Sequence, residues 1–133
     1  MNPRVSVVIP AFNESANIID SLRRINDAVT LPNEVLVVVD SSDDTTIPVV
    51  EGMDPPVPQV RILVQTYGRG PANAIRYGID QSTAPSVVVT MADGSDDVRI
   101  IDDLVRLVER GCAIAAASRY MPCLLYTSDA ADD

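Results

Sequence analysis

Five short runs of β-branched and aliphatic residues recur along the chain and indicate its architecture. Their starts lie roughly 25 to 30 residues apart, which is about the length of one strand-plus-helix unit. Most of the runs are continuously apolar rather than alternating, a pattern typical of parallel strands that are buried on both faces. We therefore expect strands at Val5–Ile9, Val35–Val39, Val60–Val64, Val87–Thr90 and Ala113–Ala117.

Helical periodicity marks segments between these runs. The apolar positions of the first segment share one face: Ile18, Leu22, Ile25 and Val29. The last segment divides into an expected buried face, Ile101, Leu104, Val105 and Val108, and an expected solvent face, Asp102, Asp103, Arg106 and Arg110. Gly111 is expected to end that helix, since glycine is favoured just past a helix C-terminus. The alternation of strands and helices predicts a three-layer α/β domain with a mostly parallel sheet.

Three polar loops follow the expected strands, at Pro10–Glu14, Asp40–Asp44 and Met91–Asp97. In open parallel sheets, ligands bind outside the carboxyl ends of the strands, so these loops are expected to converge on one site. Closely spaced carboxylates repel one another unless a cation or hydrogen-bond donors satisfy them, and oxygen ligands suit Mg²⁺ or Mn²⁺. The alternative is local, because Asp and Ser favour turns and N-caps, and Asp43 or Asp44 could cap the following helix.

The segment Gly68–Ala74 is rich in small residues, but it contains neither a dinucleotide-binding fingerprint nor a P-loop. Two compatible interpretations stay open. Small residues would let a ligand approach the backbone closely, or the segment is a loop that enters a helix with Pro71 in its first turn.

The charged residues narrow the possible chemistry. Of the 133 residues, ten are Arg, none is Lys or His, and nineteen are Asp or Glu, which gives a formal net charge of −9. This acidic balance argues against general nucleic-acid binding. Without His or Lys the chain cannot build a Ser-His-Asp triad, a Cys-His dyad, a Schiff base or a Walker A loop, so its chemistry must use carboxylates, hydroxyls, Arg and backbone amides.

The remaining composition indicates an ordinary folded domain. Apolar residues make up 47% of the chain, enough for a core, and Cys112 and Cys123 are too few for a disulfide framework. The first residues lack the apolar stretch of a signal peptide, and no run approaches the roughly 20 apolar residues of a membrane span. We therefore expect a cytoplasmic location and no membrane segment in this chain.

Five segments of the chain carry further motifs, in the order Val5–Glu14, Val37–Thr45, Gly70–Gly78, Met91–Asp93 and Ala117–Tyr120. As an ordered set they resemble the motifs of family-2 glycosyltransferases, which are inverting enzymes with the Rossmann-like nucleotide-diphospho-sugar transferase fold. The last motif is similar to the Gly-Ser-Arg-Tyr segment of the polyprenyl-phosphate (dolichol-phosphate) mannosyltransferase branch. The resemblance covers roughly residues 4–122.

The resemblance implies roles for individual residues. Those that would line the nucleotide pocket are Pro10, Ala11, Asn13, Glu14 and Asp40, with Asp40 contacting the base. Arg119 would hold the donor diphosphate, a role that suits a planar and permanently charged guanidinium.

The metal motif departs from the family pattern. Met91 stands where the family has the first acid of Asp-x-Asp, and a thioether is a poor ligand for Mg²⁺ or Mn²⁺. Asp93 would then be the main protein ligand of the metal, assisted by Ser95, Asp96 or Asp97. The second-strand motif departs as well, with two serines, residues 41 and 42, in place of Asp-Gly.

By the same resemblance, an acceptor attacks the anomeric carbon of a GDP- or UDP-sugar in line, while the metal at Asp93 and the guanidinium of Arg119 stabilise the leaving nucleoside diphosphate. A polyprenyl-phosphate acceptor is largely ionised near neutral pH and needs no general base, and it would bring the full-length protein to the membrane surface. A sugar hydroxyl would need a carboxylate base, which in the family lies beyond residue 133.

Two other functions stay open. The chain could be an inactive nucleotide-sugar-binding module, or a sugar-nucleotidyltransferase-like domain. Members of the second class normally carry a Gly-rich loop after the first strand, and Pro10–Glu14 is not such a loop.

The segment Cys123–Asp133, CLLYTSDAADD, breaks with the family pattern. It resembles translated sequencing-adapter read-through, so we expect a non-native tail; a genuine short acidic tail is the alternative. Residues 1–122 are then expected to be the N-terminal, nucleotide-sugar-binding part of a truncated glycosyltransferase domain that is inactive alone.

Overall fold

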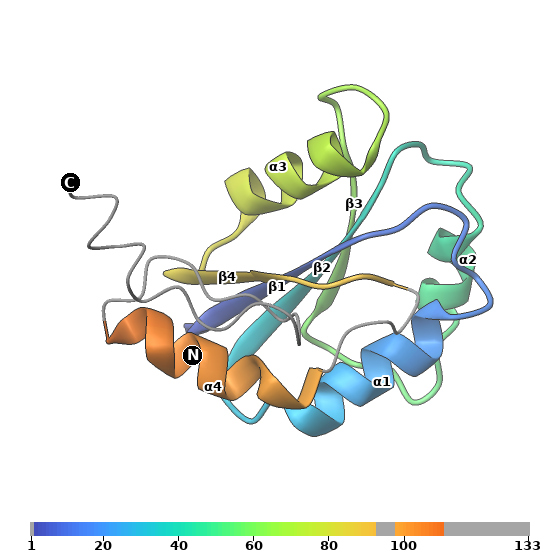
Figure 1. The fold of residues 1–133 in the computed structure, drawn as a ribbon. Helices are drawn as coiled ribbons and strands as arrows, with labels where there is room; N and C mark the ends of the chain where they lie inside the picture. The colour runs from blue at the N-terminus through green and yellow to red at the C-terminus, as the bar shows by residue number, and fades with distance from the viewer. Residues whose placement is uncertain (1, 93–97, 111–133) are drawn as a thin grey trace.

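A four-stranded, fully parallel sheet forms the centre of the computed structural model, which describes residues 2–92 and 98–110 (Figure 1). Its strands lie in the order β3-β2-β1-β4. Their bounds are β1 Val5–Pro10, β2 Asn33–Val39, β3 Val60–Val64 and β4 Ser86–Val89. Four of the five expected strands are thereby confirmed, and the expected strand at Ala113–Ala117 lies outside the described residues.

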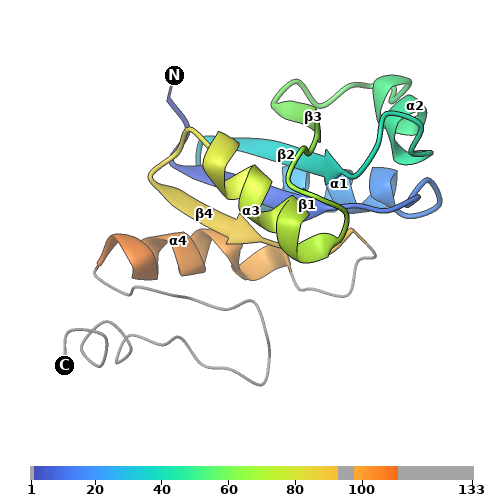
Figure 2. The same cartoon turned by 90° about the horizontal axis from the view of Figure 1, so that it is seen from above.

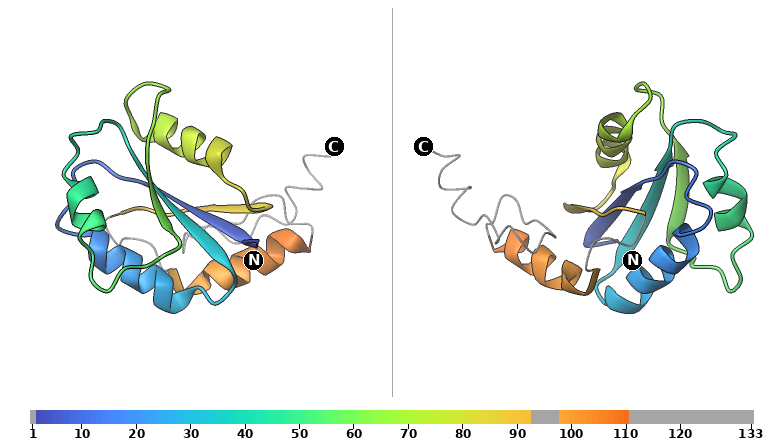
Figure 3. Two further views of the ribbon diagram at one scale, coloured as in Figure 1. Left: turned by 180° about the vertical axis from the view of Figure 1, so that it is seen from behind. Right: turned by 45° about the vertical axis from the view of Figure 1, so that its right-hand side comes forward.

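Helices cover both faces of this sheet (Figures 1 and 3). One face carries α3 (Pro71–Gln81), which Figure 2 shows lying over the strands. The other face carries α1 (Ile18–Ala28), α2 (Thr46–Glu51), the 3₁₀ helix η1 (Val98–Ile100) and α4 (Ile101–Glu109). The predicted three-layer α/β arrangement is therefore confirmed. Within residues 2–92 and 98–110, no helix is long and apolar enough to cross a membrane.

The two central strands are buried on both sides, which explains why their sequences are continuously apolar. Val7 and Val37 belong to the core on the α1 and α4 side of the sheet, and neither is exposed to solvent. Val8 and Val38 point to the opposite side, where they pack with Ala74 of α3. Each strand thus supplies alternate residues to two separate apolar layers.

Helix α3 contacts the sheet closely at a glycine. A Cβ atom added at Gly78 would lie 2.5 Å from Cγ1 of Val8, so no other residue fits there without movement. The helix begins at Pro71, after Gly70 in a left-handed conformation with φ of 120°. The interpretation of this segment as a loop that enters a helix is confirmed.

One prediction about α4 is wrong, because Asp102 is buried rather than turned to solvent. Its carboxylate accepts hydrogen bonds from the backbone N–H and the hydroxyl of Thr30, at 3.0 and 2.5 Å, and from the N–H of Leu31. These donors lie in the turn between α1 and β2 and lack a partner in helix or sheet, so a carboxylate 72 positions later satisfies them. Asp103, Arg106 and Arg110, which were predicted to face solvent with Asp102, are exposed. Gly111 lies outside the described residues.

Candidate functional site

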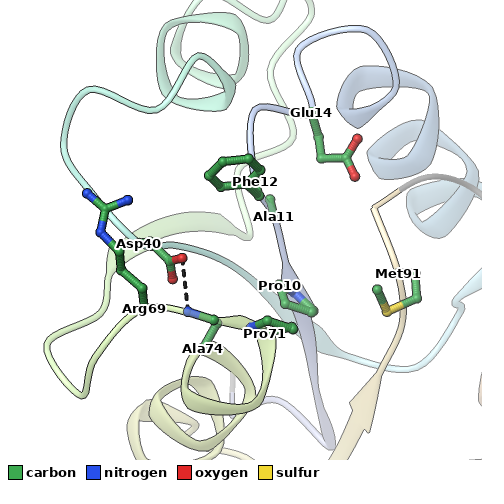
Figure 4. Close-up of a pocket in the computed structure, with 10 residues that line it drawn as sticks. Pro10, Ala11, Phe12, Glu14, Asp40, Arg69, Pro71, Ala74 and Met91 are labelled. Carbon is green, nitrogen blue, oxygen red and sulfur yellow. Dashed lines mark hydrogen bonds between the residues drawn. The ribbon is translucent and has the colours of Figure 1, made fainter.

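A pocket of about 450 Å³ opens at the carboxyl ends of the central strands, where the polar loops were expected to meet (Figure 4). The ends of β1, β2 and β4, the β3–α3 loop and the start of α3 all contribute to it. Its lining residues are Pro10, Ala11, Phe12, Glu14, Asp40, Arg69, Gly70, Pro71, Ala74 and Met91. The volume lies in the range of ordinary small-molecule sites.

Four of the five residues predicted to bind the nucleotide line this pocket: Pro10, Ala11, Glu14 and Asp40. The backbone N–H of Ala11 donates to the carbonyl oxygen of Val38 at 2.9 Å, which continues the β1–β2 ladder to the rim of the pocket. The wall formed by Pro10 and Ala11 is therefore part of the sheet and not of a free loop.

The fifth residue, Asn13, joins two loops beside the pocket. It has a left-handed backbone with φ of 48°, and its N–H donates to both carboxylate oxygens of Asp44, at 3.1 and 3.0 Å. Its side-chain oxygen accepts the backbone N–H of Thr45 at 3.1 Å. Asp44 also accepts the N–H of Thr46, the first residue of α2, at 2.8 Å, although the N-cap position that was predicted for Asp43 or Asp44 belongs to Thr45. A contact between Asn13 and a nucleotide stays a prediction.

Asp40 extends from the end of β2 and has both carboxylate oxygens engaged. Oδ1 accepts the side-chain amide N–H of Gln65 at 2.8 Å. Oδ2 accepts the backbone N–H of Gly70 at 3.1 Å, the bond that is dashed in Figure 4. The carboxylate thereby connects the ends of β2, β3 and the start of α3. Its orientation in the pocket wall is held by groups that carry no charge.

Sequence reasoning missed two conspicuous parts of the lining. Phe12 is 65% exposed at the rim, and Arg69 is an exposed guanidinium. Within the described ranges Arg69 makes no ion pair or side-chain hydrogen bond, so its charge is available to a ligand. The signal that could have found it is its place between Gly68 and Gly70, in a segment where close approach of a ligand was already considered.

The described part of the site does not form a metal centre. No group of three or more His, Cys, Asp or Glu side chains that could hold a metal occurs in residues 2–92 and 98–110. Met91 lines the pocket and offers only a thioether, which does not suit Mg²⁺ or Mn²⁺. The predicted ligands Asp93 and Ser95, together with Arg119, lie outside the described residues.

Comparison with known proteins places this site in a family context. The family model for "Glycosyl transferase family 2" matches residues 6–125. The dolichol-phosphate mannosyltransferase of Pyrococcus furiosus is 31% identical over 119 residues, which are 89% of this chain and 34% of that protein. The dolichol-phosphate mannosyltransferase of Mycosarcoma maydis is 26% identical, over 89% of this chain and 42% of that protein. The chain thus spans less than half the length of these curated relatives.

Solved structures have a similar fold. The mannosyltransferase PcManGT from Pyrobaculum calidifontis, in complex with GDP-Man and Mn²⁺, matches with a TM-score of 0.64 and 31% identity, over 82% of this chain and 32% of that one. S. aureus TarS matches with a TM-score of 0.63 over 81% of this chain and 33% of that one. At 21% identity, the second match shows the fold alone.

Proposed function

Because this chain belongs to glycosyl transferase family 2, we propose that its pocket binds the nucleotide part of a nucleotide-diphospho-sugar and that the whole protein is an inverting glycosyltransferase. The observation that carries the proposal is the position of the pocket. It lies at the carboxyl ends of the two central parallel strands, where open α/β sheets bind their ligands. Four of the residues that the family resemblance assigns to the nucleotide line it.

The chemistry of the lining suits a nucleoside. Pro10, Pro71 and Ala74 offer apolar surface for a base and a ribose. Each carboxylate oxygen has two acceptor sites, so Asp40 can accept an N–H of a base in addition to its bonds from Gln65 and Gly70. Guanine and uracil both carry such an N–H, so the pocket is compatible with a GDP-sugar and with a UDP-sugar.

For the diphosphate we keep the residues that the family resemblance implies, Asp93, Ser95 and Arg119. In this proposal Asp93 and Ser95 hold Mg²⁺ or Mn²⁺ and Arg119 pairs with the phosphate oxygens. The 31%-identical mannosyltransferase that was solved with GDP-Man and Mn²⁺ supports the use of a divalent cation. When bound, a divalent ion offsets the negative charge that develops on the leaving nucleoside diphosphate.

The proposed acceptor is a polyprenyl phosphate. Two curated relatives with the name dolichol-phosphate mannosyltransferase support this choice over a sugar hydroxyl. A phosphate oxygen is already ionised near neutral pH, so its attack on the anomeric carbon needs no general base, which fits a chain without His. Since such an acceptor is anchored by its lipid, the complete protein would work at a membrane surface.

Calorimetric titration of the chain with GDP and UDP, with and without Mn²⁺, tests the donor assignment. We expect one of the two nucleotides to bind and Mn²⁺ to tighten its binding. Asp40→Asn should weaken binding about tenfold, since a charged acceptor in the pocket is lost. Asp43→Asn is the matched control, because Asp43 lies in the same loop, pairs with Ser41 and does not line the pocket.

Asp93→Ala should leave nucleotide binding in place but remove its dependence on Mn²⁺. If the folded wild-type chain binds neither nucleotide, the donor assignment is wrong. If nucleotide binds but the complete protein shows no sugar transfer to a polyprenyl phosphate or a sugar, the alternative of an inactive binding module holds.

A further inference from the structure

Gln65 is a buried polar residue just behind the pocket wall and does not itself line the pocket. It directly follows β3, and its backbone N–H donates to the carbonyl oxygen of Val39 at 2.9 Å. The residue is only 5% exposed, which is unusual for glutamine. A buried amide is stabilising only when its hydrogen bonds are made, so the partners of Gln65 indicate its role.

The side-chain amide of Gln65 uses both of its N–H donors and its oxygen in hydrogen bonds. Nε2 donates to Asp40 Oδ1 at 2.8 Å and also to the carbonyl oxygen of Gly68. Oε1 accepts the backbone N–H of Tyr67 at 2.7 Å. One side chain therefore holds the carboxylate at the end of β2 and two consecutive residues of the turn that follows β3.

This turn needs such support because two of its residues are glycines with positive φ. Gly68 has φ of 111° and Gly70 has φ of 120°, and glycine loses more conformational freedom on ordering than any other residue. The turn carries Arg69 and Gly70, which line the pocket, and Gly70 N–H returns to Asp40 Oδ2 at 3.1 Å. A closed ring of hydrogen bonds thus runs through Gln65, Asp40 and the turn.

The far side of the turn is fixed to α3. The hydroxyl of Tyr67 donates to Asp80 at 2.7 Å, and its ring packs edge-on against Tyr77 with centroids 5.0 Å apart. These contacts lie outside the pocket and leave the inner side of the turn to Gln65.

We propose that Gln65 is a positioning residue for donor binding: it fixes Asp40 and the Gly68–Gly70 turn as one preformed wall before the nucleotide arrives. The proposal rests on the assignment of the pocket to the nucleotide. A preformed wall raises affinity because the cost of ordering two glycines is met during folding and not on binding. A role in stability alone would leave affinity unchanged in a folded variant.

Gln65→Met retains the length and volume of the side chain and removes every hydrogen bond of the amide. We expect its affinity for the nucleotide that the wild type binds to fall about tenfold. Gln59→Met is the matched control, because Gln59 lies just before the other end of β3 and donates a single bond to Asn26 at 2.8 Å.

A second variant and a measurement without ligand keep the outcome decisive. Gln65→Glu still accepts the Tyr67 N–H but donates nothing and faces Asp40 with a like charge, so its nucleotide affinity should fall further. Hydrogen exchange of the Gly70 amide in the ligand-free wild type should be slow, as expected for a bond already formed. The proposal is overturned if that amide exchanges at the rate of an unstructured loop, or if either folded variant binds nucleotide as tightly as the wild type. Absence of nucleotide binding by the wild type, with a protected Gly70 amide, would instead contradict the proposed function.

Discussion

Among the described residues that line the pocket, Arg69 is the only cation, and Glu14 and Asp40 contribute carboxylates. Within the described part of the chain no carboxylate pairs with it. An unpaired guanidinium in a concave site favours an anionic or carbonyl-rich ligand, because its fork of N–H donors matches such oxygens. A nucleotide offers both kinds of acceptor.

Arg69→Gln should weaken nucleotide binding about tenfold and reduce the dependence of the affinity on salt, since a charged contact is lost. Titration at low and high salt measures both effects. Arg110→Gln is the control, because it removes the same charge from the exposed end of α4, outside the pocket. Equal losses in the two variants would show that net charge, and not the position of Arg69, governs binding.

The position of a single residue could be predicted where a general structural rule applies. It could not be predicted where contacts with residues far away in the sequence determine it. Pro10 and Asp40 follow from the rule that parallel strands present their site at the carboxyl ends, strengthened by the family resemblance. Arg69 depends on the path of a glycine turn, which the sequence does not specify. Asp102 was misplaced because helical periodicity counts positions on one helix and ignores the backbone donors of a turn 72 residues earlier.

At the scale of elements, the contact between α3 and the sheet depends on the absence of one side chain. Gly78 lies within α3 and faces Val8 of β1, and a Cβ there would also approach Val38 of β2, at 3.2 Å. Glycine is unfavourable inside a helix by about 1 kcal/mol relative to alanine. The close packing of α3 therefore outweighs a local preference, and the pocket residue Ala74 of the same helix depends on it.

Gly78→Ala should lower the free energy of unfolding by about 1–3 kcal/mol despite the better helix propensity, because the new methyl group overpacks the interface with Val8. Urea unfolding measures this change. Val8→Ala removes the atoms that the new methyl group would meet. The double variant should therefore lose less free energy of unfolding than the sum of the losses in Gly78→Ala and Val8→Ala measured separately. Additive losses would contradict the contact.

The strands were the most predictable elements, since a continuously apolar run in a βαβ pattern indicates a buried parallel strand. Their exact bounds were harder to predict. β2 begins at Asn33, two residues before its apolar run, because polar Asn33 and Glu34 continue the ladder opposite Val5 and Ser6 of β1. The order β3-β2-β1-β4 does not follow from periodicity, which shows that a strand is buried but not which strands are its neighbours.

For the whole molecule, the two edges of the sheet have different roles. The pocket lies at the carboxyl edge, while three tightly bonded carboxylates, Glu34, Asp102 and Glu109, lie at the opposite edge. Glu34 of β2 accepts bonds from Ser6 and Thr83, at 2.5 and 2.7 Å. These contacts join β1, β2 and the turn before β4 far from the site, so stability and ligand binding can be changed separately.

The pKa values at this edge follow from their surroundings. Burial raises the pKa of Glu34, but the hydrogen bonds from Ser6 and Thr83 and the charge of Arg61 outweigh burial, so it lies below its ordinary value. The pKa of Asp102 is likewise lowered, because the bonds from Thr30 and its neighbour exceed the effect of burial. A carboxyl whose pKa is lower in the folded state binds fewer protons there than in the unfolded chain. The stability that these two carboxyl groups contribute is therefore present above their pKa in the unfolded chain, and it is lost as the pH falls through their pKa in the folded protein.

The free energy of unfolding should consequently decrease as the pH is lowered from about 5 to about 3, the range in which carboxyl groups protonate. Asp102→Asn should lower it by about 1–3 kcal/mol at pH 7, since an ionised acceptor of three N–H and O–H donors is lost. At pH 3 the wild type has lost part of that advantage, so the two curves should converge. Asp103→Asn is the control, because Asp103 lies on the same helical turn but is exposed. It removes the same charge near the helix N-terminus and should change the free energy of unfolding little at either pH. A constant difference between wild type and Asp102→Asn at both pH values would show that the carboxylate of Asp102 acts through shape and not through its charge.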